Sequence, residues 1–192
     1  MDALTPDRTQ PDITLGILAG GCATRLGGND KAWLVYRHEL LIERTLRAFG
    51  DVFTARCVSA NRNLDRYATL GLCAIPDRVA GFPGPLAGLD ALLAACTTPL
   101  LLTLPVDLRA IPPGLVARLR MEGEDGAVAE DANGLQPLVA LWPVARARIA
   151  AADALERGER AVHRLVRELA LPVVRFDGAD FGNLNTPDDF LT

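Results

Sequence analysis

Short apolar runs alternate with helically spaced apolar positions along the first half of the chain. Each run stops at a turn signal or a polar residue, which predicts buried strands. The strands are expected over residues 13–19, 52–59, 72–76 and 100–106. Helices are expected between them over residues 40–49, 64–70 and 85–95. Strand and helix thus alternate three times, which is the pattern of a parallel sheet with crossover helices.

The second half is less regular. Asn133-Gly134 is a strong signal for a two-residue hairpin turn, because both residues tolerate positive φ. The remaining elements are expected to be helices after Pro113 and over 161–169, and strands over 127–130, 138–142 and 172–176. We therefore expect an α/β fold with a mostly parallel sheet and a small β-hairpin in the second half.

The chain shows neither an internal repeat nor a low-complexity linker. We therefore expect a single domain over residues 13–192. Residues 1–12 are polar and contain two prolines, which predicts a flexible lead-in.

Composition narrows the classes of function. Apolar residues make up 49% of the 192 residues, which excludes an intrinsically disordered chain. The formal charge of −4 argues against a nucleic-acid binder, which would carry a basic excess. No apolar run approaches the ~20 residues that span a bilayer, and the first residues lack a signal-peptide pattern. We expect a cytoplasmic protein with no nucleic-acid and no membrane partner.

Cysteine and histidine give no sign of a metal or nucleophile site. The four cysteines form no C-x-x-C pair and the chain has two histidines, so a structural zinc site is not expected. We interpret the thiols as free and His38 as a loop residue, and no partner makes His163 a base.

A glycine-rich segment follows the first expected strand directly. Residues 18–31 read L-A-G-G-C-A-T-R-L-G-G-N-D-K. Glycines let backbone N–H groups approach and cradle phosphate oxygens, and Arg25 and Lys31 add two cations. The alternative is a tight turn with solvated cations, but the strand, the glycines and the cations coincide. The segment is neither a Walker A loop nor a G-x-G-x-x-G fingerprint, so we predict a different kind of phosphate site.

At this segment the sequence resembles nucleotidyltransferases that begin L-A-G-G-x-x-x-R-[ML]-G-G-x-D-K. Within that superfamily it is most similar to the molybdenum cofactor guanylyltransferases, over nearly the whole chain from Ile13. Further blocks that carry the resemblance are 60–62, 83–88, 105–107, 136–141, 158–160 and 183–187. Their order and spacing are more specific than any block alone.

The resemblance implies a Rossmann-like three-layer fold and transfer of GMP from Mg-GTP to molybdopterin, with or without molybdenum already loaded. Pyrophosphate would be released. The implied GTP-binding residues are Leu18, Ala19, Gly20, Gly21, Lys31, Ser59, Asp77 and Asp107. The implied pterin-binding residues are Asn183 and Asn185, and the implied metal is Mg²⁺ on Asp107. Transient contact with molybdenum-insertion proteins or molybdoenzyme chaperones is a further expectation.

Asp107 also has a physical argument in its favour. It follows an apolar strand, and ligands of open α/β sheets gather at the carboxyl edge, where a carboxylate can hold Mg²⁺. The alternative is a turn or helix-capping aspartate before Pro112. Asp77 has the same edge position after the third strand, with a solvated loop aspartate as its alternative.

The chain departs from the family pattern at three places. The family usually reads C-D-x-P where this chain has Val106-Asp107-Leu108-Arg109, and it often has Asn where this chain has Ser59. Residues 38–41 replace the usual Gly-x-Pro-Leu, and we expect them to shape a helix start.

Several polar residues keep two interpretations. Gly84 to Gly88 could present helix N–H groups to a ligand or allow close helix packing. Asn183 and Asn185 alternate, so their amides would face one side, whereas Thr186 suits an N-cap. Three arginines at helical spacing could face a pterin phosphate or form a solvated helix face: Arg160, Arg164 and Arg167.

The expected chemistry is in-line attack of a molybdopterin phosphate on the α-phosphorus of GTP. A phosphate is already anionic, so no general base is required, and Arg25, Lys31 and Asp107 would act as the catalytic residues by aligning and neutralising charge. Two other interpretations stay open. One is a related enzyme that uses CTP with the pterin, or a nucleotide with a sugar phosphate. The other is a non-catalytic nucleotide-binding homologue.

Overall fold

The structure is a computed structural model that describes residues 10–20, 30–79 and 84–190. The expected lead-in at residues 1–9 lies outside the described residues, as do Gly21, Cys22, Arg25 and residues 81–83. Residues 10–12, also expected in the lead-in, belong instead to the first strand, β1 (Gln10–Leu18).

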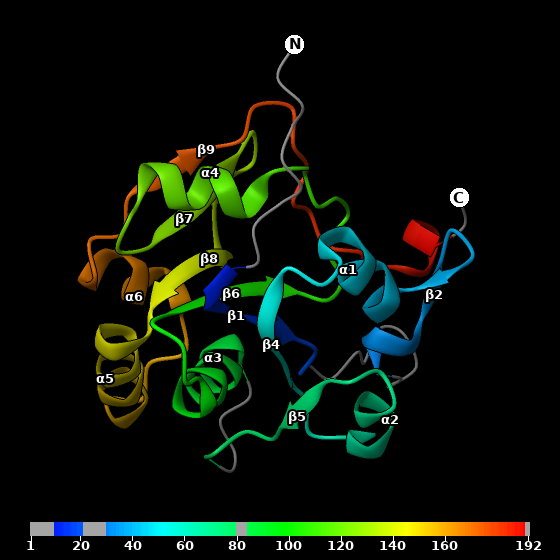
Figure 1. The fold of residues 1–192 in the computed structure, drawn as a ribbon, viewed down its shortest axis with the longest axis horizontal. Helices are drawn as coiled ribbons and strands as arrows, with labels where there is room; N and C mark the ends of the chain where they lie inside the picture. Colours follow the sequence, from blue (N-terminus) through cyan, green and yellow to red (C-terminus); the bar gives the residue numbers. More distant parts are fainter. Residues whose placement is uncertain (1–9, 21–29, 80–83, 191–192) are drawn as a thin grey trace.

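One seven-stranded sheet takes strands from both halves of the chain (Figure 1), in the order β5-β4-β1-β6-β8-β7-β9. After β1, its strands are β4 (Phe53–Ser59), β5 (Cys73–Ile75), β6 (Leu100–Pro105), β7 (Ala127–Asp131), β8 (Gly134–Pro143) and β9 (Val173–Arg175). Only β8 among these runs against its neighbours. The expected parallel first half is confirmed, and so is a hairpin at the Asn133-Gly134 signal. The two residues between its strands are Ala132 and Asn133, and Gly134 is the first residue of β8, with positive φ.

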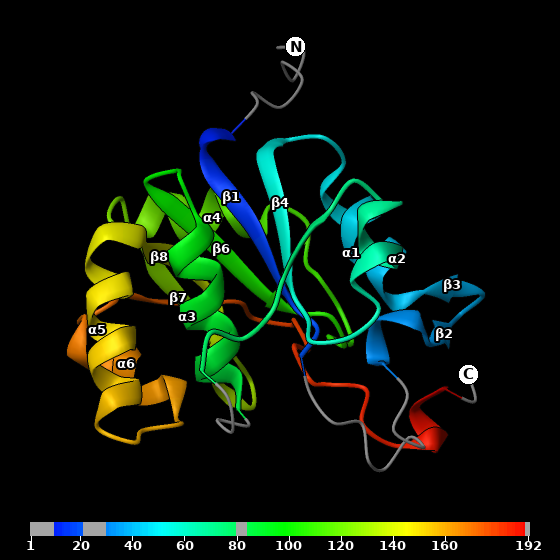
Figure 2. The same ribbon diagram turned by 90° about the horizontal axis from the view of Figure 1, so that it is seen from below.

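Helices cover both faces of this sheet, so the fold has three layers. The helices are α1 (Leu41–Phe49), α2 (Leu64–Ala68), α3 (Pro85–Ala95), α4 (Leu115–Glu122), α5 (Val144–Glu156) and α6 (Val162–Glu168). Figure 2 shows α3, α5 and α6 on one side of the strands and α1 and α2 on the other. Buried residues of α4 join those of α1 in one core cluster, whereas α3, α5 and α6 contribute to the second.

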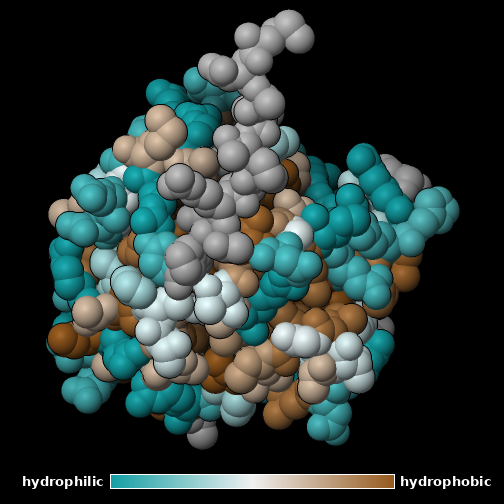
Figure 3. All heavy atoms as spheres, in the orientation of Figure 1, coloured by the Kyte–Doolittle hydropathy of each residue, from teal (hydrophilic) through white to brown (hydrophobic). Residues whose placement is uncertain are grey.

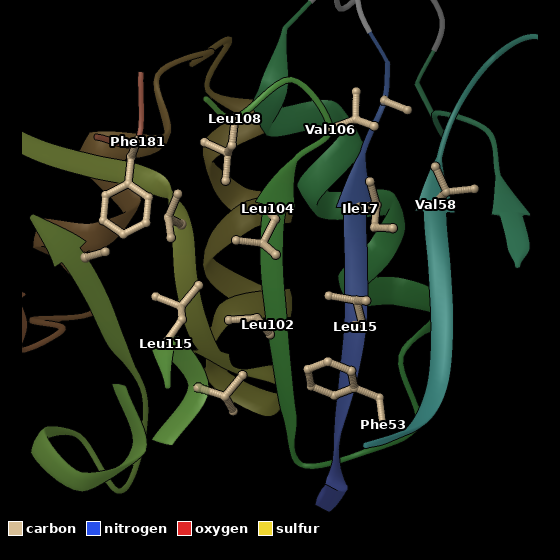
Figure 4. Packing of buried hydrophobic residues seen from close by; sticks show 14 of the residues in the cluster. Leu15, Ile17, Phe53, Val58, Leu102, Leu104, Val106, Leu108, Leu115 and Phe181 are labelled. Carbon is tan, nitrogen blue, oxygen red and sulfur yellow. The ribbon is translucent and has the colours of Figure 1, made fainter. Parts of the chain in front are cut away.

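Successive side chains of a strand point to opposite faces of the sheet, so the strands contact the helices on both faces. Leu15 and Ile17 of β1 and Leu102 and Leu104 of β6 point to the same face, where Phe53 and Leu115 pack against them (Figure 4). Every residue of β6 is buried, as the continuous apolar run predicts for a central strand. The packed sheet therefore holds the carboxyl ends of β1 and β6 in fixed positions.

A small second sheet follows the glycine-rich segment. It pairs β2 (Val35–Tyr36) with β3 (Glu39–Leu40), and the two residues of the turn, Arg37 and His38, both have positive φ. Residues 38–41 were expected to shape a helix start. Only Leu41 begins α1, while Glu39 and Leu40 form β3 and His38 lies in the turn.

A short 3-10 helix, η3 (Pro187–Phe190), follows Thr186, where the N-cap interpretation implies the start of a helix. The thirteen-residue α5 was not expected at all, and it packs on α3 and α6. No helix among the described residues has the length and apolarity needed to cross a bilayer.

A groove lies between α1 and α4. Its volume is about 500 Å³, and Phe49, Ile111 and Leu115 line it together with Arg44 and Arg47. Figure 3 shows apolar residues between the polar ones on the face seen in Figure 1. Both cations of the groove are already engaged, because Arg44 donates to the carbonyls of Leu108 and Arg109 and Arg47 pairs with Glu39.

Candidate active site

The sheet changes its direction of winding between β1 and β6. After β1, the chain forms β4 on one side and β6 on the other, so the connections leave in opposite directions. Open α/β sheets bind ligands in the crevice at such a point, outside the carboxyl ends of the strands. Here the backbone N–H of Val106 donates to the carbonyl of Leu18 (3.1 Å), and that of Ala19 donates to the carbonyl of Ser59 (3.0 Å). The three strand ends are thus held side by side.

Lys31 and Asp107 meet at this edge. Lys31 opens the 3-10 helix η2 (Lys31–Trp33), and its Nζ lies 2.5 Å from Asp107 Oδ2. The two residues are 76 positions apart in the chain. The Asp107 side chain is 9% exposed and that of Lys31 is 20% exposed. Asp107 lies in the turn that follows β6 and does not cap α4, whose N-cap is Gly114. Of the turn or helix-capping alternative, the structure thus rules out only the capping role.

Lys31 is the only lysine in the 192-residue sequence, and the other 19 of the 20 Lys and Arg residues are arginines. A lysine ammonium is a compact charge with three donors, whereas arginine is a planar fork. The ammonium here donates to acceptors on different segments, which a compact group can reach together.

The second acceptor is Asn185, in the C-terminal segment. Its Oδ1 lies 2.8 Å from Lys31 Nζ, and the carbonyl of Leu184 lies 3.5 Å away. The backbone N–H of Leu184 donates to the carbonyl of Asp107 (2.8 Å), which fixes this segment beside the end of β6. Figure 2 shows the segment, in orange to red, crossing at the carboxyl ends of the strands. Asn183 pairs with Leu108 through the backbone and is exposed.

The sequence did not predict which residues hold the Lys31 segment in place. Asp30 is the N-cap of η2, and its Oδ1 accepts from the N–H of Ala32 (3.1 Å). Its Oδ2 accepts from the hydroxyl of Tyr67 (2.8 Å) and from Asn63 Nδ2 (3.2 Å). Burial, and then the carboxylate of Asp30, raise the pKa of Tyr67, so the phenol keeps its proton and donates. The short helix α2 therefore anchors the segment that carries Lys31.

Ser59 lies under the site, not on its surface. It is fully buried, and its hydroxyl is a buried polar atom with no partner among the described residues. A Cβ added to Gly88 would come within 2.6 Å of Ser59 Oγ, and one added to Gly20 would lie 3.6 Å away. Gly88 is thus needed for close packing of α3 on β4, which favours the packing interpretation of that glycine.

Asp77 is paired with a residue to which the sequence assigned no role. Asn61 Nδ2 donates to Asp77 Oδ2 (2.9 Å), and the N–H of Asp77 donates to Asn61 Oδ1 (2.9 Å). These residues follow the ends of β4 and β5, which pair in parallel. Asp77 Oδ1 is buried and has no partner in the described part of the chain. A buried acceptor of this kind is open to a donor on a ligand or a water molecule.

The three arginines expected near a pterin phosphate lie in α6 or just before it, and Arg160 lies next to Gly84, the N-cap of α3. Arg160 precedes the helix, and Arg164 lies 3.7 Å from Glu159. All three arginines, Arg167 included, are exposed, as a solvated helix face would be. The structure therefore brings together Lys31, Asp107 and Asn185 from the expected set, with Leu18, Ala19 and Gly20 at the adjoining strand end.

The oxygen atoms around Lys31 suit a hard cation. Asp107 Oδ2 and Asn185 Oδ1 both lie within 2.8 Å of the ammonium, so oxygen atoms from two segments converge on one positive charge. Mg²⁺ prefers oxygen ligands and fills its remaining positions with water and phosphate oxygens. Among the described residues, no group of three or more His, Cys, Asp or Glu could hold a metal ion. Asp107 and Asn185 thus offer oxygen atoms of the kind that Mg²⁺ binds.

Comparison with known proteins identifies the family of this chain. A family model described as a MobA-like NTP transferase domain matches residues 15–173. The chain is 37% identical over 185 residues to a molybdenum cofactor guanylyltransferase of Yersinia pestis (strain Pestoides F), with 94% of each chain covered.

Solved structures share the fold at lower identity. One is molybdopterin-guanine dinucleotide biosynthesis protein A from Archaeoglobus fulgidus, with a TM-score of 0.70, 22% identity, and 92% of this chain and 94% of that chain covered. Another is 2-C-methyl-D-erythritol 4-phosphate cytidylyltransferase from Thermus thermophilus, with a TM-score of 0.66, 23% identity and the same coverage of both chains. The expected α/β fold and the resemblance stated from the sequence are confirmed. This chain belongs to the MobA-like NTP transferase family and is a nucleotidyltransferase.

Proposed function

We propose that this nucleotidyltransferase transfers GMP from GTP to molybdopterin and releases pyrophosphate. The observation that carries the proposal is the meeting of Lys31, Asp107 and Asn185 at the point where the sheet changes winding direction. A relative that is 37% identical over nearly its whole length bears the name molybdenum cofactor guanylyltransferase.

Lys31 would bind the phosphates of the nucleotide. Its ammonium now pairs with Asp107 and Asn185, and a triphosphate would offer it more negative charge. Leu18, Ala19, Gly20 and Gly21 would contact the guanine nucleotide, Asp77 with its free buried oxygen would bind the nucleoside part, and Arg25 would add charge. Ser59 would act from below, since it is buried beneath Gly20.

Asp107 would hold Mg²⁺ together with phosphate oxygens. When bound, the ion would neutralise charge on the phosphates that react and leave. Asn183 and Asn185 would bind the pterin side, and Asn185 is the one that touches Lys31. In the transfer, an oxygen of the molybdopterin phosphate forms a bond to the α-phosphorus as the bond to the β-phosphate oxygen breaks. The protein contributes alignment and charge, because the nucleophile is already anionic.

The single lysine makes a direct binding test available. An amine-selective reagent can modify one side chain only, Lys31, and peptide mapping separates it from the α-amino group. We expect Mg-GTP to protect Lys31 from modification more strongly than Mg-CTP or Mg-UTP. Equal protection by all three nucleotides would contradict the choice of GTP, and no protection would contradict a phosphate role for Lys31.

Activity is tested with purified protein, GTP, Mg²⁺ and molybdopterin, by measuring dinucleotide and pyrophosphate together. We expect Lys31→Ala and Asp107→Asn to lower kcat by roughly 10²–10³-fold, the loss typical of removing one charge-stabilising group. The matched control is Arg47→Gln, which removes a surface ion pair between α1 and Glu39 of β3 and should leave kcat unchanged. Nucleotide binding without pyrophosphate release by the unaltered protein would support the non-catalytic alternative instead.

A further inference from the structure

Arg109 ties the C-terminal segment to the end of β6 by its backbone and its side chain. Its N–H donates to the carbonyl of Gly182 (2.6 Å). Its guanidinium donates to Asp189 Oδ1 (2.7 Å), and Nε lies 3.4 Å from Asp180 Oδ2. Arg109 stands two positions after Asp107, so these contacts act on the chain next to the candidate metal ligand.

Asp189 links the Arg109 side chain to the backbone of Asn185. While its Oδ1 accepts from Arg109, its Oδ2 accepts from the N–H groups of Asn185 and Thr186 and from the Thr186 hydroxyl, each at 2.9 Å. The N–H of Thr186, then the Arg109 guanidinium and the N–H of Asn185, hold the pKa of Asp189 well below its usual range. The carboxylate thus fixes the turn from which the Asn185 amide reaches Lys31.

The exposure of the pair decides what it can do. The Arg109 side chain is 40% exposed and that of Asp189 is 17% exposed. Exposed ion pairs add little to global stability, because water screens them and two long side chains must be ordered. A local effect on the turn at residues 185–186 is therefore a better account of the pair than a contribution to folding.

We propose that Arg109 is a positioning residue that holds Asn185 against Lys31 and Asp107 by way of Asp189. The inference rests on the proposed function, because it assigns Asn185 to the pterin side. Position 109 is where the family pattern usually has proline, which has neither the N–H nor the cation that these contacts use. The departure noted from the sequence is thus a set of contacts that a proline could not make.

The test compares Arg109→Gln and Arg109→Lys with the control Arg47→Gln. Arg47 makes a two-point contact with Glu39 on the surface and touches none of the site residues above. We expect Arg109→Gln to lower kcat/KM for molybdopterin by about tenfold, while the Kd for Mg-GTP changes by less than about twofold. Arg109→Lys keeps a cation and should recover part of the loss. Hydrogen exchange at the N–H groups of Asn185 and Thr186 should become faster in Arg109→Gln only.

Each outcome decides the proposal. The role of Arg109 would be overturned if Arg109→Gln left kcat/KM for molybdopterin unchanged. It would also be overturned if kcat/KM fell equally for both substrates because a smaller fraction of the variant was folded. If Arg109→Gln does not fold, Asp189→Asn, which keeps the shape and one acceptor oxygen, gives the same comparison. If the unaltered protein makes no dinucleotide, the proposed function fails. Hydrogen exchange then still decides the proposal, since equal rates at residues 185–186 in Arg109→Gln and Arg47→Gln would overturn it.

Discussion

Tyr67 shows how a residue remote in sequence can fix a charged one. The ring is fully buried, and its hydroxyl donates to the carboxylate that caps η2. The Trp33 ring packs 5.1 Å from the Tyr67 ring, and the Arg66 guanidinium lies 3.8 Å above the Trp33 ring. These contacts immobilise the residues on either side of Lys31, which favours a preset position for the ammonium.

We expect Tyr67→Phe to lower the free energy of unfolding by about 1–2 kcal/mol, since Asp30 loses a buried donor. Because burial and Asp30 raise the Tyr67 pKa, this loss should be the same at pH 7 and pH 9. Denaturant unfolding at both pH values measures it. The other tyrosine, Tyr36, packs edge-on against Phe190, and Tyr36→Phe serves as the control. If both substitutions lowered the free energy of unfolding equally, the hydrogen bond from Tyr67 to Asp30 would make no specific contribution to stability.

Among individual residues, the sequence predicted the charged ones better than the residues that hold them in place. Lys31 and Asp107 were predicted because glycine spacing and a strand end are local signals. The partnership of Tyr67 with Asp30 spans 37 positions and leaves no local pattern. Asn61 likewise became identifiable as the partner of Asp77 only once β4 and β5 were placed side by side.

Among the elements, the β2–β3 hairpin carries an uncommon turn. Arg37 (φ 50°) and His38 (φ 68°) both occupy the left-handed region, in which Asn and Gly are favoured. We expect the double variant Arg37→Asn/His38→Gly to raise the free energy of unfolding by about 0.5–1 kcal/mol, because the strain at both positions is relieved. Thermal unfolding measures it, and a lower melting temperature would show that the Arg37 side chain, 5.1 Å from the Tyr36 ring, matters more than the turn.

Helix α5 was missed because its buried face has little hydropathic contrast. Much of that face is alanine, including Ala147, Ala150, Ala151 and Ala154. Alanine favours helix formation but adds only a weak apolar stripe. The helix also begins directly after β8 at Val144, with no polar break between strand and helix. The strongly amphipathic α1 and the Pro-initiated α3 were predicted correctly to within one residue.

At the scale of the molecule, Asp131 joins the hairpin of the second half to the C-terminal segment. It is 3% exposed and lies at the end of β7. Its Oδ2 accepts from the N–H of Phe181 (2.9 Å), and its Oδ1 accepts from the N–H of Asn133 (2.8 Å) and from Gln136 Nε2 (3.1 Å). Burial alone would raise the pKa of Asp131, but these donors together lower it.

We expect Asp131→Ala to lower the free energy of unfolding by about 1–3 kcal/mol at pH 7, because buried donors lose their acceptor. A lowered pKa in the folded state means that the carboxylate stabilises the protein above its unfolded pKa of about 3.9. This contribution is lost as the pH falls through the lower, folded value. Denaturant unfolding at pH 7 and near pH 3 should therefore show the gap between protein and variant narrowing in acid. A gap that stays constant would contradict an ionised Asp131.

The overall architecture followed from the sequence more fully than the C-terminal path did. Three strand–helix repeats specify the parallel half, and the Asn-Gly turn marks the hairpin that reverses β8. The route of residues 180–189 across the strand ends depends on Asp131, Arg109 and the end of β6 together. Such tertiary contacts have no sequence period, which is why the site was predicted residue by residue but not as an assembled network.

The distance along the chain between Lys31 and Asn185, 154 positions, has a consequence for biosynthesis. The ribosome synthesises β6 and Asp107, which follows that strand, well before it synthesises residues 180–189, which pack beside them. The ribosome synthesises β1, β4 and β6 early, but the contact of Asn185 with Lys31 can form only near the end of translation. Products of premature termination before position 180 would accordingly contain every strand of the seven-stranded sheet and lack Asn183 and Asn185.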